Sequence, residues 1–99
     1  MSKAIRFHQT GGPEVLQWDD IDVGRPSNNQ ILVRHTAIGL NYIDTYHRSG
    51  LYPLPLPSTI GMEAAGIVQE VGVNVSEVAE GDRIAYACPP PGSYSEERL

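Results

Sequence analysis

The segment Gly61-Met-Glu-Ala-Ala-Gly66-Ile-Val-Gln-Glu-Val-Gly72 indicates the fold most clearly. Its small and β-branched residues from Glu63 to Val71 are typical of a strand, bounded by glycines on both sides. A glycine inside a strand indicates a bulge or a point where another backbone comes close, and Gly66 is such a residue. Gly72 then turns the chain. The segment therefore predicts a strand that packs tightly against a neighbour.

The residues before this segment contain further short strands. Ala4 to His8 alternates apolar and polar residues, and a turn at Thr10–Pro13 lets Val15–Trp18 pair back as a hairpin. Residues 19–29 are polar and predict a loop. The β-branched run from Gln30 to Ile38 is the most secure strand of the chain.

A short helix is predicted between the two main strands, from Tyr42 to Arg48. Asn41 is a good N-cap residue, and Asp44 stands three positions later, where its carboxylate can accept a hydrogen bond from the Asn41 backbone N–H. Gly50 supplies the C-terminal stop. Residues 51–57 follow with alternating prolines, which remove backbone donors and predict a stiff, extended loop.

The remaining residues add strand Arg83–Tyr86, a rigid proline loop at Cys88–Gly92 and the start of another strand near Tyr94. No helix or cap closes the chain at Leu99, so we expect it to be truncated there. The frequent turns and short strands predict one mainly β domain over residues 1–99. We expect a partly open β-barrel with one or two short helices.

Composition narrows the functional classes. The 99 residues carry seven Lys and Arg against twelve Asp and Glu, a net charge of −5, which disfavours nucleic acid as a partner. No run approaches the roughly 20 apolar residues of a membrane span, and the start lacks a secretory signal pattern. A single cysteine, Cys88, excludes an internal disulfide. We expect a cytoplasmic protein.

Several of these stretches resemble one family. Gly61–Gly72 resembles the Gly-His-Glu-x-x-Gly segment of medium-chain dehydrogenases/reductases, with Met62 at the histidine position. The stretch Gly39–Pro53, and His8–Leu16 near the start, resemble its zinc-free quinone oxidoreductase branch, and the match covers almost the whole chain. The resemblance implies a GroES-like barrel that a nucleotide-binding Rossmann domain follows. No G-x-G-x-x-G motif occurs in these 99 residues, so we expect that Rossmann domain to be absent from this chain.

The resemblance also bears on metal binding. Zinc members of the superfamily place a cysteine and a histidine where this chain has Asn41 and Met62. A carboxamide and a thioether are poor zinc ligands, and His8, His35 and His47 are not spaced as a ligand set. We therefore predict no metal site. A quinone suits such a site, because its conjugated ring accepts a hydride without metal polarisation.

The resemblance implies roles for four residues, and each has a plainer alternative. Asn41 and Asp44 are the candidate cofactor-binding residues, although the same pair would also form the helix cap. Tyr46 and Tyr52 are the candidate substrate-binding residues, since a phenol can stack on a quinone and hydrogen-bond to it. Ordinary half-buried packing is their alternative. No residue is assigned a catalytic role.

Neighbouring residues are expected to be structural. Tyr42 and Ile43 should face the core, and Met62 should fill the space where a metal would sit. Glu63 should pair with an arginine or with a backbone donor. Arg48 and Arg83 are the candidate arginine partners.

The resulting functional prediction is the N-terminal module of an NADPH-dependent quinone oxidoreductase, homodimeric in the intact parent and inactive as this fragment alone. An enoyl or alkenal reductase of the same zinc-free group is an alternative, because the barrel half cannot separate a quinone from another conjugated carbonyl. A free-standing GroES-like interaction module is the alternative from another class. Such a module needs a mobile apolar docking loop, whereas residues 19–29 are polar.

Overall fold

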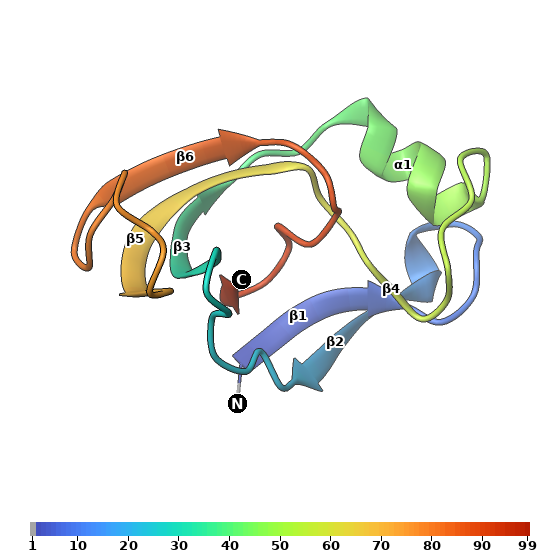
Figure 1. Ribbon diagram of the computed structural model, residues 1–99. Coiled ribbons are helices and arrows are strands. Elements are labelled where there is room, and N and C mark those ends of the chain that lie inside the picture. The colour runs from blue at the N-terminus through green and yellow to red at the C-terminus, as the bar shows by residue number, and fades with distance from the viewer. Residues whose placement is uncertain (1) are drawn as a thin grey trace.

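Two antiparallel sheets and one short α-helix make up the structure, a computed structural model that describes residues 2–99 (Figure 1). The elements in chain order are β1 (Ser2–Phe7), the 3-10 helix η1 (Pro13–Val15), β2 (Leu16–Ile21), β3 (Ile31–Ile38), α1 (Tyr42–Ser49), β4 (Ser58–Thr59), β5 (Glu63–Val71), β6 (Arg83–Ala87) and β7 (Glu97–Arg98). The mainly β prediction is confirmed. None of the helices within residues 2–99 has the length and apolar character needed to cross a membrane.

The first sheet has the order β2-β1-β4 and confirms the predicted N-terminal hairpin. The strand β2 runs on to Ile21, however, so the prediction of a loop from residue 19 is wrong at its start. Cross-strand charge pairing explains the difference. Asp19 accepts hydrogen bonds from Arg6 Nε at 3.1 Å and pairs with His8 Nε2 at 2.8 Å, and these contacts, the His8 contact foremost, lower the pKa of its carboxyl.

The second sheet has the order β6-β5-β3-β7, and its inner strand β5 is the strand that the Gly61–Gly72 segment predicts. Gly66 lies opposite His35 of β3, beside a register irregularity between His35 and Ala37. A Cβ atom on Gly66 would overlap the backbone carbonyl oxygen of Arg34. The predicted close backbone approach at Gly66 is therefore confirmed.

Residues 94–98 join the two sheets. The Ile5 N–H donates to the Tyr94 carbonyl at 2.7 Å, and the His35 N–H donates to the Glu96 carbonyl at 2.8 Å. This segment is the strand start that the sequence predicts near Tyr94. The sheets do not close around it, because β6 pairs only with β5 among the strands of residues 2–99. The prediction of a partly open barrel is confirmed.

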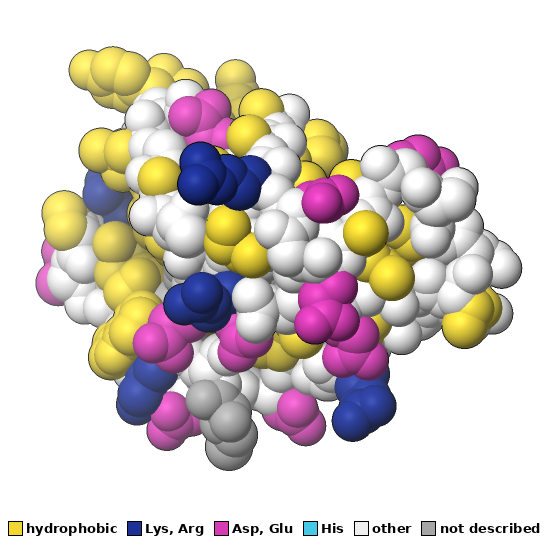
Figure 2. All heavy atoms as spheres, turned by 90° about the vertical axis from the view of Figure 1, so that its left-hand side faces the viewer, with side chains coloured by type: hydrophobic (Ala, Val, Ile, Leu, Met, Phe, Trp, Pro, Cys, Tyr) yellow, Lys and Arg dark blue, Asp and Glu magenta, His cyan; other side chains and the backbone are white. Residues whose placement is uncertain are grey.

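The main core lies under the first sheet. Phe7, Val15 and Ile60 are buried together, with Tyr94 packed against them. The face shown in Figure 2, on the β5–β6 side, mixes acidic, basic and apolar side chains with no continuous basic patch among the atoms it displays. Helix α1 lies at the opposite end, at the upper right of Figure 1.

Candidate active site

The helix α1 carries two of the four candidate residues, Asp44 and Tyr46, and a third, Asn41, is its N-cap. The start of the helix is built as the sequence predicts. Asn41 has an extended backbone, with φ −129° and ψ 154°, and its N–H donates to Asp44 Oδ2 at 3.0 Å. The Asp44 N–H donates in return to the Asn41 carbonyl at 3.0 Å. Gly50 ends the helix in the left-handed region at φ 89°. The cap and the stop are therefore confirmed, with Ser49 added to the predicted helix.

Asp44 lies in the interior rather than on the surface. Its side chain is 2% exposed, and its Oδ2 atom also accepts a hydrogen bond from the Tyr94 hydroxyl at 2.6 Å. Burial, and then the hydrogen bond to Asp44, raise the pKa of Tyr94. The other oxygen, Asp44 Oδ1, is buried and has no hydrogen-bond partner among the described residues. The capping interpretation of Asp44 thus has direct geometric support, and a cofactor contact stays a prediction.

Tyr46 and Tyr52 lie together on the surface. Their ring centroids are 5.4 Å apart at an interplanar angle of 73°, an edge-to-face arrangement. The Tyr52 N–H donates to the Tyr46 carbonyl at 3.2 Å, which ties the proline loop to the helix. The side chains are 36% and 51% exposed, so both retain aromatic surface for a planar ligand. The two predicted substrate residues are brought together, although their role stays a prediction.

Tyr42 does not face the core, and that prediction is wrong. It is 82% exposed, whereas Asp44 and His47 occupy the buried side of the helix. Tyr42 and Tyr46 are four residues apart and therefore share the opposite face. Ile43 is half-buried. Asp44 faces inward, where the Tyr94 hydroxyl is its hydrogen-bond partner, and apolar periodicity does not reveal such a partner.

Glu63 lies at the rim of an open hollow rather than in an ion pair. Within residues 2–99 no salt bridge joins it to an arginine, and Arg48 Nε donates instead to the Gly11 carbonyl at 3.2 Å. The arginine pairing predicted for Glu63 is therefore wrong. The Glu63 side chain lies where a Cβ atom on Gly39 would stand, so the glycine leaves room for it.

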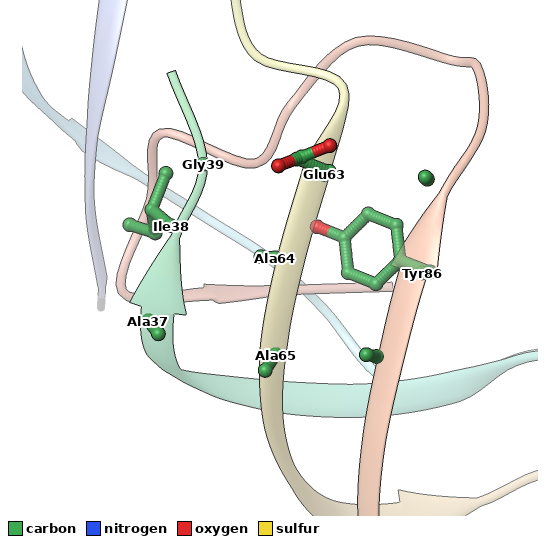
Figure 3. A pocket seen from close by; sticks show the side chains of 9 residues that line it. Ala37, Ile38, Gly39, Glu63, Ala64, Ala65 and Tyr86 are labelled. Atoms are coloured by element: carbon green, nitrogen blue, oxygen red, sulfur yellow. The ribbon is translucent and has the colours of Figure 1, made fainter. Parts of the chain in front are cut away.

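The hollow has a volume of about 600 Å³ and lies where β3 ends and β5 begins (Figure 3). Alanines form much of its wall, and Glu63 and Tyr86 supply its polar groups. Its lining residues are Ala37, Ile38, Gly39, Glu63, Ala64, Ala65, Ala85, Tyr86 and Ala87. None of the four candidate residues lines it. Sequence reasoning missed this hollow, and the only signal for it was the small residues on three separate strands.

His35 on β3 links Tyr86, which lines the hollow, to the backbone of Ser95. Its Nδ1 atom lies 2.7 Å from the Ser95 carbonyl, which can only accept, so Nδ1 carries the proton. The neutral ring then accepts the Tyr86 hydroxyl at Nε2, at 2.8 Å. Burial lowers the pKa of His35 and raises that of Tyr86.

This geometry predicts acid sensitivity of the fold. Because the folded-state pKa of His35 lies below its unfolded value of about 6.5, its contribution to stability is full above that pH and is lost as the pH falls through the lowered folded value. The free energy of unfolding in urea should fall between neutral pH and pH about 5. The unfolding free energy of the His35→Gln variant should fall less, because glutamine stays uncharged over this pH range. If the unfolding free energies of the wild type and of His35→Gln fall in parallel as the pH is lowered, His35 is not the source of the acid sensitivity.

The two positions that the resemblance places at a zinc site do not suit the ion. Asn41 offers a carboxamide and Met62 a thioether, both poor zinc ligands. Across residues 2–99 no three His, Cys, Asp or Glu side chains converge on one point. Asn41 is instead engaged in the helix cap, and Cys88 is exposed.

Comparisons with known proteins place the chain among related sequences. The family model for the alcohol dehydrogenase GroES-like domain matches residues 27–97. The chain is 54% identical over 97 residues, 97% of its length, to a quinone oxidoreductase of Pseudomonas aeruginosa. It is 44% identical over its full length to a 2-haloacrylate reductase of a Burkholderia species.

A solved structure shares the fold closely. The crystal structure of Escherichia coli quinone oxidoreductase complexed with NADPH matches with a TM-score of 0.94 and 52% identity, covering 97% of this chain. The chain spans about 30% of the length of each of these three relatives, 30%, 31% and 30% in turn.

Proposed function

Since the chain belongs to the alcohol dehydrogenase GroES-like domain family, we propose that it is the substrate-side module of a zinc-independent NADPH:quinone oxidoreductase. The observation that carries the proposal is the edge-to-face Tyr46–Tyr52 pair beside the Asn41 cap, in a chain 54% identical to a quinone oxidoreductase. A cytoplasmic location and a homodimeric parent are part of the same proposal.

The residues of this module bind and orient the acceptor. NADPH, when bound, supplies the hydride. Tyr46 and Tyr52 offer an aromatic rim against which a planar quinone can stack. The α1 cap fixes Asn41 at the start of the helix, where its carboxamide can meet the nicotinamide end of the cofactor. A conjugated acceptor needs orientation more than polarisation, so a metal is dispensable, and the reduced product can take its protons from water.

A second acceptor class has its own support. The 2-haloacrylate reductase is 44% identical over the whole chain, and its name describes reduction of a conjugated acid. An enoyl or alkenal reductase built on the same module is therefore the alternative proposal. The two differ in whether the acceptor is a ring that stacks or a short open chain.

The experiment that tests the proposal measures NADPH oxidation by the full-length protein that contains this chain. A quinone and a small conjugated carbonyl are compared by kcat/KM. A higher value for the quinone is expected. A higher value for the open-chain acceptor favours the alternative, and no oxidation of NADPH with either class contradicts both. A ring-shaped oligomer without turnover would instead fit a free-standing interaction module.

Replacing one tyrosine of the pair should weaken acceptor binding. Tyr46→Ala removes the ring that stacks on Tyr52, and we expect the KM for the quinone to rise roughly threefold to tenfold. Tyr46→Phe keeps the ring and should change KM less than about twofold. Leu51→Ala is the matched control, since Leu51 is 62% exposed beside the pair. A KM unchanged in Tyr46→Ala would remove Tyr46 from the site.

A further inference from the structure

Tyr94 is held rigidly between the two sheets. Its N–H donates to the Ile60 carbonyl at 3.0 Å, and its carbonyl accepts from the Ile5 N–H at 2.7 Å. Its ring packs against the buried cluster of Phe7, Val15 and Ile60. A tyrosine fixed by its backbone and by its ring has a fixed hydroxyl position, and this hydroxyl points at helix α1.

Within residues 2–99 the buried carboxylate of Asp44 is the one hydrogen-bond partner of that hydroxyl. The Tyr94 hydroxyl and the Asn41 N–H both donate to the same atom, Asp44 Oδ2, at 2.6 and 3.0 Å. Among residues 2–99 no Lys, Arg or His forms an ion pair with Asp44. A buried charge with few donors depends strongly on each of them, so the tyrosine hydroxyl fixes the orientation of the carboxylate.

The carboxylate in turn fixes the start of the helix. Asp44 and Asn41 exchange two hydrogen bonds, so a rotation of the Asp44 side chain releases the Asn41 N–H. Asn41 stands at the boundary between an extended backbone and α1, where a lost cap lets the first turn fray. The contacts thus form one chain from the core to the cap: Tyr94, Asp44, Asn41.

We propose that Tyr94 is a positioning residue for the reaction, which acts through Asp44 to hold Asn41 at the active-site wall. The proposal rests on the proposed oxidoreductase function. Tyr94 itself touches neither acceptor nor cofactor in this role. Its contribution is that the carboxamide of Asn41 meets the cofactor in one geometry rather than in several.

The test uses the full-length protein with Tyr94→Phe, which removes only the hydroxyl. Tyr86→Phe is the matched control, because Tyr86 is also half-buried and its hydroxyl contacts His35 Nε2 and Arg98 Nη1 rather than α1. Two quantities are measured: kcat and KM for NADPH and quinone, and hydrogen exchange of the peptide that spans residues 40–46. We expect Tyr94→Phe to lower kcat/KM about tenfold, chiefly through kcat, and to speed exchange about tenfold. Tyr86→Phe should change neither by more than about twofold.

A double-mutant cycle tests whether Tyr94 acts through Asp44. Asp44→Asn keeps an acceptor oxygen but removes the charge. If the two residues work as one unit, the combined loss in Tyr94→Phe/Asp44→Asn is much smaller than the product of the single losses. If the losses in kcat/KM of the two single variants multiply in the double variant, Tyr94 and Asp44 act independently, and the proposal is overturned.

The two arms separate this proposal from the proposed function. Unchanged exchange at residues 40–46 in Tyr94→Phe would overturn the anchoring. Faster exchange with kcat/KM equal to that of Tyr86→Phe would overturn the positioning role. If the wild-type protein fails to oxidise NADPH with every acceptor tested, the proposed oxidoreductase function is contradicted. A change in hydrogen exchange that is specific to Tyr94→Phe would still support the anchoring of Asn41 by Tyr94.

Discussion

Isolated from the rest of a full-length protein, the 99-residue chain should fail to bind NADPH at micromolar concentrations and should reduce no quinone. The pyrophosphate of a dinucleotide is normally held at a glycine-rich turn and the helix N-terminus that follows it. No G-x-G-x-x-G occurs among these 99 residues, so Asn41 would contact only the nicotinamide end of the cofactor. Calorimetric titration of the chain with NADPH measures this directly.

The full-length protein is the control for that titration and should bind NADPH under the same conditions. A micromolar dissociation constant for the chain alone would show that residues 1–99 hold the phosphates themselves. An anion-binding element would then have to lie in this module.

Phe7→Ala should have the largest effect on folding. Phe7 is fully buried in the cluster with Val15 and Ile60, and truncating a buried phenylalanine to alanine costs about 3–5 kcal/mol. Since a domain of this size has about 5–15 kcal/mol of stability in total, much of it should be lost. The free energy of unfolding in urea, followed by circular dichroism, measures the change.

Leu51→Ala is the control for this substitution. Leu51 is 62% exposed, so its truncation should change the unfolding free energy by less than about 0.5 kcal/mol. A loss below about 1 kcal/mol in Phe7→Ala would contradict the central place of Phe7 in the core. Because Tyr94 packs on the same cluster, Phe7→Ala should also loosen the contact between Tyr94 and Asp44.

The sequence predicted the secondary structure well at positions where the backbone conformation or a close contact requires one particular residue type. The cap at Asn41, the stop at Gly50 and the close approach at Gly66 each follow from one residue type and its φ/ψ or steric demands. Strand β2 was missed beyond Trp18 because Asp19 and Asp20 look like loop residues. Their charges are matched across the hairpin, which only the pairing register reveals.

The site was predicted less completely, for a physical reason. Which side of α1 is buried depends on Tyr94, a residue 50 positions after Asp44, and no short-range pattern contains that contact. Tyr42 was therefore assigned to the core although it is exposed. Tyr46 and Tyr52 were accessible to sequence reasoning because both lie in the Gly39–Pro53 segment that carries the resemblance, six positions apart across the end of α1.

Metal independence of the full-length protein is the property that follows most directly from Asn41 and Met62. NADPH oxidation with a quinone is measured for the untreated protein, for the protein stripped with a strong chelator, and for the stripped protein after zinc is added back. Asn41 and Met62 offer poor zinc ligands, so the rate should be the same in all three preparations. A rate that collapses on chelation and returns with zinc would contradict the account of this site.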